Sequence, residues 1–209
     1  MLRLTVTHAD RRALEMFSRE FAAPGTSWSP GTTGSGGRPS VSPVLRQVAW
    51  LVPKEQVTPT VTVDGTTSAV TLPPLRPPLA PEPLASAAPA LPAGPRKTVP
   101  LVKIALGRSG DKGDTSNIGL IARHPALLAV LKEQVTPERV KTYLDHLVLG
   151  PIVRYDLPGI HAINLVCERA LGGGGMASLR NDALGKGMAQ MLLDMPVEVP
   201  ALLLQEVKA

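Results

Sequence analysis

A proline-rich stretch divides the chain into two parts. Residues 72–98, LPPLRPPLAPEPLASAAPALPAGPRKT, hold nine of the 22 prolines. Proline fixes φ and has no N–H group to donate, so the stretch predicts neither helix nor sheet but an extended linker. A proline-rich ligand for a partner domain is the alternative interpretation. The linker separates residues 1–71 from residues 99–209.

The first part has too few elements for a hydrophobic core of its own. Residues 8–21 predict one helix capped by Asp10, and residues 44–52 and 60–65 predict strands. One helix and two or three strands bury little surface, and domains of this size are marginal. We therefore interpret residues 1–71 as the remnant of a larger N-terminal domain, a partial α/β segment.

The second part has the elements of a complete α+β domain. Apolar periodicity predicts strands over 101–106, 117–123, 152–157 and 160–167, and helices over 125–134, 137–148 and 183–194. Thr136 and Pro137 stand at the N-cap and first position of the second helix. The order β-β-α-α-β-β-α predicts a sheet with a layer of helices on one face.

Composition argues against several classes of function. Residues 99–209 hold twelve Lys and Arg against eleven Asp and Glu, whereas a nucleic-acid-binding domain concentrates basic residues. No stretch approaches the roughly 20 apolar residues of a membrane span. The single cysteine, Cys167, forms no internal disulfide, which favours a cytoplasmic location. The four histidines share no metal-ligand spacing, so we expect no metal.

Polar residues gather in GRSGDKGDTSNIG, residues 107–119, between two predicted strands. We predict a loop whose glycines allow close backbone approach. Its charged residues, Asp111, Lys112 and Asp114, suit a general acid or base and an anion-binding cation. The alternative is a solvated loop with a local ion pair of little energetic value.

Four successive glycines, Gly172–Gly175, follow the last predicted strand. Such a run is entropically unfavourable, and it suits a site where backbone N–H groups surround an anion. Ser178 and Arg180 add further donors. A flexible loop is the alternative. Because residues 107–119 also lie at a strand end, we expect both segments on the same side of the sheet.

One histidine lies in the predicted strand over 160–167. His161 alternates with Ile163, Leu165 and Cys167, so it is either a core residue or a catalyst, and Asn164 points the other way. Cys167 lies among apolar residues, and we expect its thiol to be inert.

Long runs of this sequence resemble one known family. GRSGDKGDTSNIGLIAR, YLDHLVLGPIVRYDLPGIHAINLV and ALGGGGMASLRNDALGKGMAQMLLDM look like the C-terminal domain of the AtuA-type acyclic terpene utilisation proteins, which is described as ferredoxin-like. Residues 23–57 are similar to the end of the family's large N-terminal domain. The resemblance covers about 1–65 and 99–205. Since members are usually several hundred residues long, it implies that most of the N-terminal domain is a separate polypeptide or that the chain is a fragment.

The resemblance also implies candidate site residues. The positions that match the family's motifs are Ser109, Asp111, Lys112, Asp114, Asn117, His161, Asn164, Gly172, Gly173, Gly174, Gly175 and Arg180. We assign Asp111, Lys112, Asp114 and His161 as catalytic candidates and the others, with Ser178, as ligand-binding candidates. No cofactor is implied beyond a CoA thioester as substrate.

Two functions remain open at this point. In the first, the chain acts in branched-chain or acyclic terpenoid acyl-CoA catabolism and binds an anionic acyl-CoA-type ligand at its glycine-rich loops. Any activity would then be acid–base chemistry on that ligand, carried out by this chain alone or only with a partner chain. In the second, it is a non-catalytic assembly subunit that docks on an acyl-CoA carboxylase or on a separate N-terminal domain chain. Both imply a homo- or hetero-oligomer, without nucleic acid or membrane.

Overall fold

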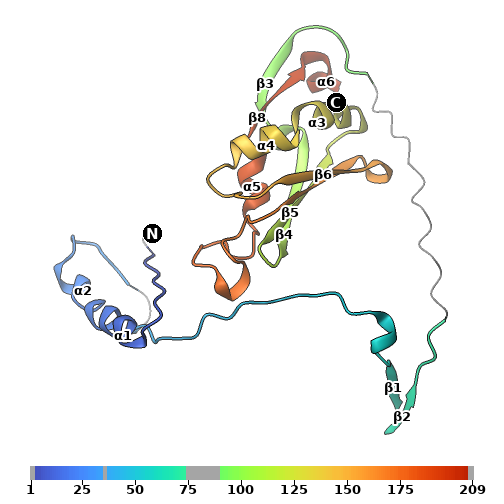
Figure 1. Cartoon of the computed structure of the whole chain (residues 1–209). Helices are drawn as coiled ribbons and strands as arrows, with labels where there is room; N and C mark the ends of the chain where they lie inside the picture. The colour runs from blue at the N-terminus through green and yellow to red at the C-terminus, as the bar shows by residue number, and fades with distance from the viewer. Residues whose placement is uncertain (1–2, 35–36, 74–89, 207–209) are drawn as a thin grey trace. The chain divides into compact units, whose positions relative to one another are not determined.

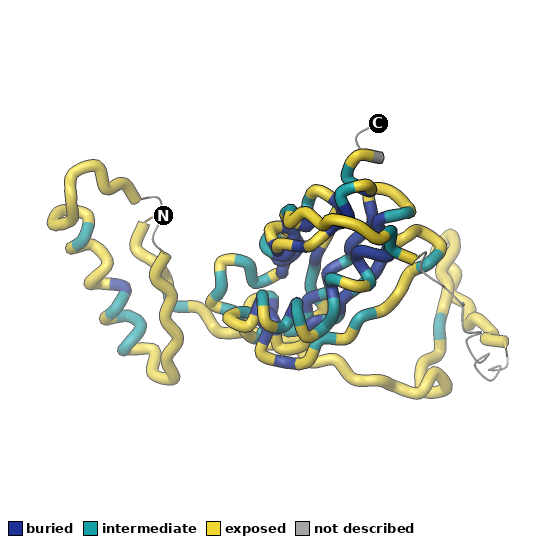
Figure 2. The backbone as a smooth tube through the Cα atoms, turned by 90° about the horizontal axis from the view of Figure 1, so that it is seen from above, coloured by how far each residue is buried: buried dark blue, intermediate teal, exposed yellow. Residues whose placement is uncertain are grey.

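Nearly all buried side chains lie in the C-terminal half of the chain. The computed structural model describes residues 3–34, 37–73 and 90–206. Within these ranges, Ser18 is the only buried residue outside residues 90–206, as Figure 2 shows in dark blue. Burial of apolar surface is the main stabilising contribution to folding. The hydrophobic core of the described chain therefore lies within residues 90–206.

The central element of this domain is a four-stranded antiparallel sheet in the order β4-β5-β7-β6 (Figure 1), built from β4 (Ala105–Lys112), β5 (Thr115–Ala122), β6 (Ile152–Leu157) and β7 (Ala162–Cys167). Side chains alternate between its faces. Ser116, Ile118 and Leu120 of β5 are fully buried, whereas Ile121 is 44% exposed. One face therefore packs on the core. We call the other the open face; it carries Leu106, Arg108, Asn117, Ile121, Val153, Tyr155 and Asn164.

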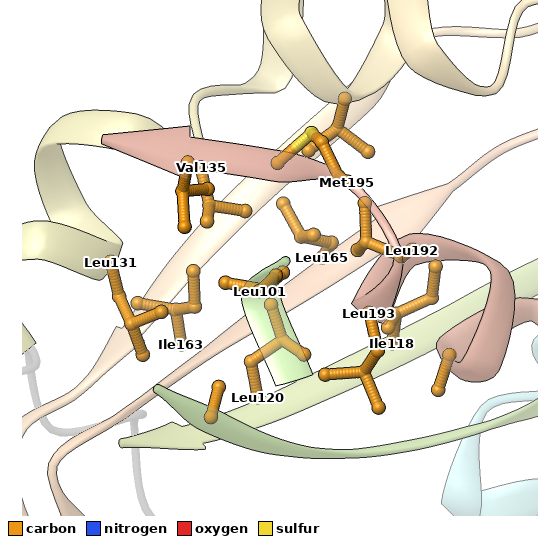
Figure 3. Close-up of a cluster of buried hydrophobic side chains, with 14 of the residues drawn as sticks. Leu101, Ile118, Leu120, Leu131, Val135, Ile163, Leu165, Leu192, Leu193 and Met195 are labelled. Carbon is orange, nitrogen blue, oxygen red and sulfur yellow. The ribbon is translucent and has the colours of Figure 1, made fainter. Parts of the chain in front are cut away.

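Three of the helices that contribute to the core are α3 (Leu128–Gln134), α4 (Pro137–Tyr143) and α5 (Met188–Leu193). Figure 3 shows Leu131 of α3 beside Ile163, and Leu192 and Leu193 of α5 beside Ile118. The Thr136 hydroxyl accepts from Arg139 N, which confirms the predicted N-cap of α4.

A second ladder joins the two ends of the domain. Strand β3 (Arg96–Pro100) pairs antiparallel with β8 (Pro196–Pro200), and α6 (Ala201–Glu206) follows. Both strands were missed, and the prediction that 96–98 belong to a linker is wrong. Val197 and Val199 are fully buried, so their packing outweighs the low strand propensity of the nearby prolines. The prolines lie only at the ends of the ladder, where they interrupt few backbone hydrogen bonds. Most of the predicted linker, residues 74–89, lies outside the described residues.

The predicted fold class, α+β with a ferredoxin-like sheet and helices on one face, is confirmed. The predicted order β-β-α-α-β-β-α runs from β4 to α5, inside the added β3 and β8. Boundaries differ at several places. The helix predicted over 137–148 ends at Tyr143, and the strand predicted over 117–123 already begins at Thr115. Residues Leu101–Lys103 form a 3-10 turn and the strand begins only at Ala105. The last helix is shorter than 183–194, and Leu184 of its predicted buried face is 47% exposed.

The N-terminal part adds no described residue to this core. Its elements are α1 (Arg11–Glu20), α2 (Pro24–Ser27), the 3-10 turn Lys54–Gln56 and a hairpin of β1 (Thr60–Val63) with β2 (Thr66–Ala69). The Asp10 side chain accepts from Arg12 N, which confirms the predicted cap. The strand predicted over 44–52 is wrong: this stretch is irregular, has no partner strand, and Leu51 is fully exposed. No helix of residues 3–34, 37–73 and 90–206 has the length and apolarity to cross a membrane.

Candidate functional site

The stretch predicted as a loop, residues 107–119, is a tight β-hairpin. Strands β4 and β5 pair down to Lys112 and Thr115, which leaves Gly113 and Asp114 as a two-residue turn. Gly113 has φ +65°, and glycine at the first position of such a turn is the type II′ arrangement. The loop prediction is wrong because three of the four glycines, Gly107, Gly110 and Gly119, lie within strands, where glycine is uncommon. The polar side chains therefore lie at fixed positions on a sheet.

The Asp114 carboxylate is bound by the backbone of the glycine run. Its Oδ1 accepts from Gly173 N at 2.7 Å and from Leu171 N at 3.1 Å, and its carbonyl oxygen accepts from Ala170 N at 2.8 Å. The predicted anion nest exists, but its anion is an aspartate of the same chain. The N–H groups of Gly174 and Gly175 donate to carbonyls of Leu171 and Ala183. The prediction that this run binds a ligand anion is therefore wrong.

Each of the four glycines has positive φ, between +48° and +98°. A side chain on Gly174 would overlap the carbonyl of Gly113 and approach Asp114 N to 3.1 Å. Glycine is required here by conformation and by close backbone contact. The hairpin turn and the glycine run thus meet on the same side of the sheet, as predicted.

Two predicted ligand donors also support this loop. The Arg180 guanidinium donates to the carbonyls of Ala170 and Leu147, the latter at 3.0 Å. The Ser178 hydroxyl accepts from Arg180 N at 3.1 Å. Arg180 thus satisfies two backbone carbonyls, and Ser178 satisfies a backbone N–H group of the segment after β7. Their assignment to a ligand is replaced by this internal role.

Ser109 joins the hairpin to α5. It is 5% exposed, and its hydroxyl accepts from Ala189 N at 2.9 Å in the first turn of the helix. It also donates to the Lys186 carbonyl at 3.3 Å. This is a helix cap supplied from another element, and it occupies the hydroxyl that we had assigned to a ligand.

The remaining polar residues of the hairpin surround a cavity of about 460 Å³, lined by Arg108, Ser109, Gly110, Asp111, Lys112, Asn117, Gly119 and Lys186. Three of these side chains are cationic. Asp111 is the one carboxylate among them, and its Oδ1 lies 3.6 Å from Lys186 Nζ. The structure thus brings Asp111, Lys112 and Asn117 together, as the sequence predicts, and places an excess of positive charge around them.

An apolar cavity adjoins this polar one on the open face. It measures about 230 Å³ and shares Arg108 and Gly119 with the first. Its other lining residues include Leu106, Ile121 and Leu157. Asn117 Nδ2 donates to Asn164 Oδ1 at 3.4 Å, so the predicted residue Asn164 lies beside the polar cavity. The two cavities together form one surface with a cationic end and an apolar end.

His161 is not where the sequence placed it. It follows the 3-10 turn Pro158–Ile160 in the left-handed region, with φ +51°, and is exposed. Strand β7 begins only at Ala162, because the Pro-Gly turn extends further than expected. His161 lines neither cavity of the open face. Its predicted place on the strand is wrong, and its catalytic role stays a prediction.

Cys167 is fully buried, as predicted. Desolvation raises the pKa of its thiol to about 11, which keeps it protonated near neutral pH and unreactive. Within the part of the chain that the structure describes, no group of three or more His, Cys, Asp and Glu side chains is arranged to hold a metal ion.

Two cations of the polar cavity were missed. Arg108 lies within residues 107–119. A strand over this segment would place Arg108, Gly110 and Lys112 on one face, and that pattern could have identified Arg108. Lys186 is far away in sequence. Its position is set by Asp182, whose carboxylate accepts from Lys186 N at 2.7 Å and Gly187 N at 2.8 Å. No local pattern signals that this segment reaches the hairpin.

The family of this fold follows from a comparison of sequence. Residues 99–198 match the family model described as the AtuA ferredoxin-like domain. Residues 99–198 form an AtuA ferredoxin-like domain. No curated protein and no solved structure matches the chain.

The matched range of the AtuA ferredoxin-like domain contains both cavities of the open face and the complete contact between hairpin and glycine run. The match confirms the resemblance of the C-terminal domain and associates the chain with acyclic terpene utilisation. The resemblance of residues 23–57 to the family's N-terminal domain stays a prediction.

Proposed function

We propose that the open face of the AtuA ferredoxin-like domain binds an anionic acyl-CoA-type ligand in branched-chain or acyclic terpenoid acyl-CoA catabolism. The observation that carries this proposal is the pair of adjoining cavities. Arg108, Lys112 and Lys186 offer positive charge to phosphate or carboxylate groups, and Asn117 offers an amide. The apolar cavity beside them accommodates a short branched acyl group.

The position of Asp111 supports its role in the acid–base part of this proposal. It is the carboxylate that lines the polar cavity, whereas Asp114 is bound by backbone N–H groups. Lys186 lies beside Asp111, with its Nζ 3.6 Å from Asp111 Oδ1. A general base must lie within hydrogen-bond distance of the proton that it abstracts. Asp111 lines the cavity, so a ligand bound there can approach its carboxylate.

Binding is expected to depend on the cavity cations. Arg108→Ala and Lys112→Ala are each expected to weaken binding of isovaleryl-CoA roughly tenfold, because each removes a charge-assisted contact. Isothermal titration calorimetry of the whole chain measures the effect. Free CoA is expected to bind more weakly than isovaleryl-CoA, since it leaves the apolar cavity unfilled.

Lys54→Ala, which removes an exposed charge far away in sequence, is the matched control and is expected to bind like the parent. If both cavity variants keep the parent's affinity while their thermal unfolding is unchanged, the open face is not the ligand site.

An assembly role is the second candidate, and a specific observation favours it. Large apolar residues of the segment 48–52 stay exposed, among them Val48 at 68%, Trp50 at 75% and Leu51 at 101%. Neighbouring exposed apolar residues are typical of an interaction surface. A separate N-terminal domain chain or an acyl-CoA carboxylase subunit would supply the missing partner surface.

The N-terminal part is expected not to fold alone. Residues 1–73, produced separately, are expected to show no cooperative thermal transition by circular dichroism, because the described residues bury almost no apolar side chain. Residues 90–209 serve as the comparison and are expected to unfold in one sharp transition. A sharp transition for 1–73 would show a self-sufficient domain and contradict the assembly role.

A further inference from the structure

A second cavity of the domain has the chemistry of a binding site and no part in the open face. It measures about 610 Å³ and lies among β3, the 3-10 turn Leu101–Lys103 and α6. Its lining residues are Lys97, Val99, Val102, Lys103, Arg123, Leu127, Ala201, Leu204 and Gln205. None of them lines the polar or the apolar cavity described above.

The charges around this cavity are of one sign. Lys97, Lys103 and Arg123 come from three separate segments, and the lining contains no carboxylate. Among the described residues, no ion pair involves any of these three, whereas the adjacent Arg96 is paired with Glu133 at 2.8 Å. Like charges that share one cavity repel one another. An anion bound between them would remove that repulsion.

One of the cations is held in place before any ligand arrives. Arg123 Nε donates to the carbonyl oxygen of Val102 at 2.9 Å. This bond fixes the plane of the guanidinium at the cavity wall. A fixed guanidinium presents its terminal N–H groups in a fork that matches carboxylate and phosphate oxygens, and less side-chain entropy is lost on binding.

The rest of the wall is apolar. Val99, Val102 and Leu204 pack partly buried against the core, and Leu127 is fully buried. A simple inorganic anion would leave Val99, Val102 and Leu204 facing water. An anionic head with a hydrocarbon chain satisfies both halves of the cavity at once.

We propose that this cavity binds an amphipathic anion, a carboxylate or phosphate head on an apolar chain, taken up from solution as a single molecule. Lys97, Lys103 and Arg123 hold the head, and the chain lies on Val99, Val102 and Leu204. The apolar side chains line a cavity rather than a flat patch, which favours one dissolved molecule over a lipid surface.

Decanoate, kept below its micelle concentration, is the probe. Calorimetric titration of the whole chain is expected to show saturable binding that weakens with added salt. The double variant Lys97→Gln, Lys103→Gln is expected to raise the dissociation constant at least tenfold. The control, Arg46→Gln with Lys54→Gln, removes the same charge from exposed positions elsewhere and is expected to bind like the parent.

Chain length tests the apolar half without any substitution. Each CH₂ removed between decanoate and hexanoate is expected to weaken binding roughly fourfold, which is the value of a buried CH₂. Equal affinity for hexanoate, decanoate and inorganic phosphate would overturn the amphipathic site and leave only a general attraction for anions.

Two further outcomes are decisive. Sedimentation with phosphatidylglycerol vesicles that depends on Lys97 and Lys103, without decanoate binding, would assign the cavity to a membrane surface and overturn the proposal. The double variant is expected to keep the parent's affinity for isovaleryl-CoA. Its failure to do so would place both ligands in one site, whereas loss of decanoate binding alone supports two independent sites.

Discussion

Gly174→Ala is expected to destabilise the domain by about 2–5 kcal/mol. A non-glycine residue at positive φ costs about 1–2 kcal/mol, and the added methyl group also overlaps the backbone of the hairpin turn, an overpacking effect of about 1–3 kcal/mol. Since small domains are stable by only about 5–15 kcal/mol, this change removes a large share of the total. Urea denaturation of residues 90–209, followed by circular dichroism, measures it.

The neighbouring glycine provides the matched control. Gly175 also has positive φ, at +48°, but a Cβ there meets no atom within 4 Å. Gly175→Ala is expected to cost only about 1–2 kcal/mol, the conformational part alone. Equal effects at both positions would contradict the close contact between Gly174 and the turn at Gly113.

Asp114→Ala is expected to have the second-largest effect, a loss of about 2–4 kcal/mol. The change removes the acceptor of two charge-assisted hydrogen bonds and leaves the N–H groups of Leu171 and Gly173 without it. Asp114→Asn keeps one carbonyl oxygen and is expected to fall between the parent and Asp114→Ala. The same urea denaturation measures both variants.

Asp111→Ala is the control for charge. Its carboxylate has only a long contact to an exposed lysine, so its loss is expected to change stability by at most about 1 kcal/mol. The two aspartates also allow a ligand-binding role to be distinguished from a structural role. If Asp114→Ala unfolds like the parent but no longer binds isovaleryl-CoA, Asp114 contacts the ligand and its assignment to the internal contact is wrong.

Much of the domain could be predicted from sequence because its strongest signals are local. The strand at residues 152–157 is visible in the alternation of apolar and polar residues. The cap at Thr136 depends on one hydroxyl next to the start of the helix. The pairing of β3 with β8 could not be predicted from local signals. About a hundred residues separate the paired positions, and both strands contain proline, which locally disfavours a sheet.

The candidate site was predicted in part for the same reason. The two polar segments were recognised, and they do meet. What sequence could not supply was the direction of each side chain: the hairpin turns Asp114 inwards to the glycine run and leaves Lys112 outside. A carboxylate beside a glycine-rich backbone is read equally well as catalyst or as internal anion, and only the geometry decides between them.

The β3–β8 ladder has a consequence for how this domain is used in longer chains. Because its first and last strands run side by side in opposite directions, the polypeptide enters and leaves the domain at neighbouring points. A unit with adjacent ends can be inserted into a loop of a host protein, or rejoined end to end and opened elsewhere, with little distortion of either. The domain therefore has the properties of a portable module, which a host chain can carry internally as readily as at a terminus.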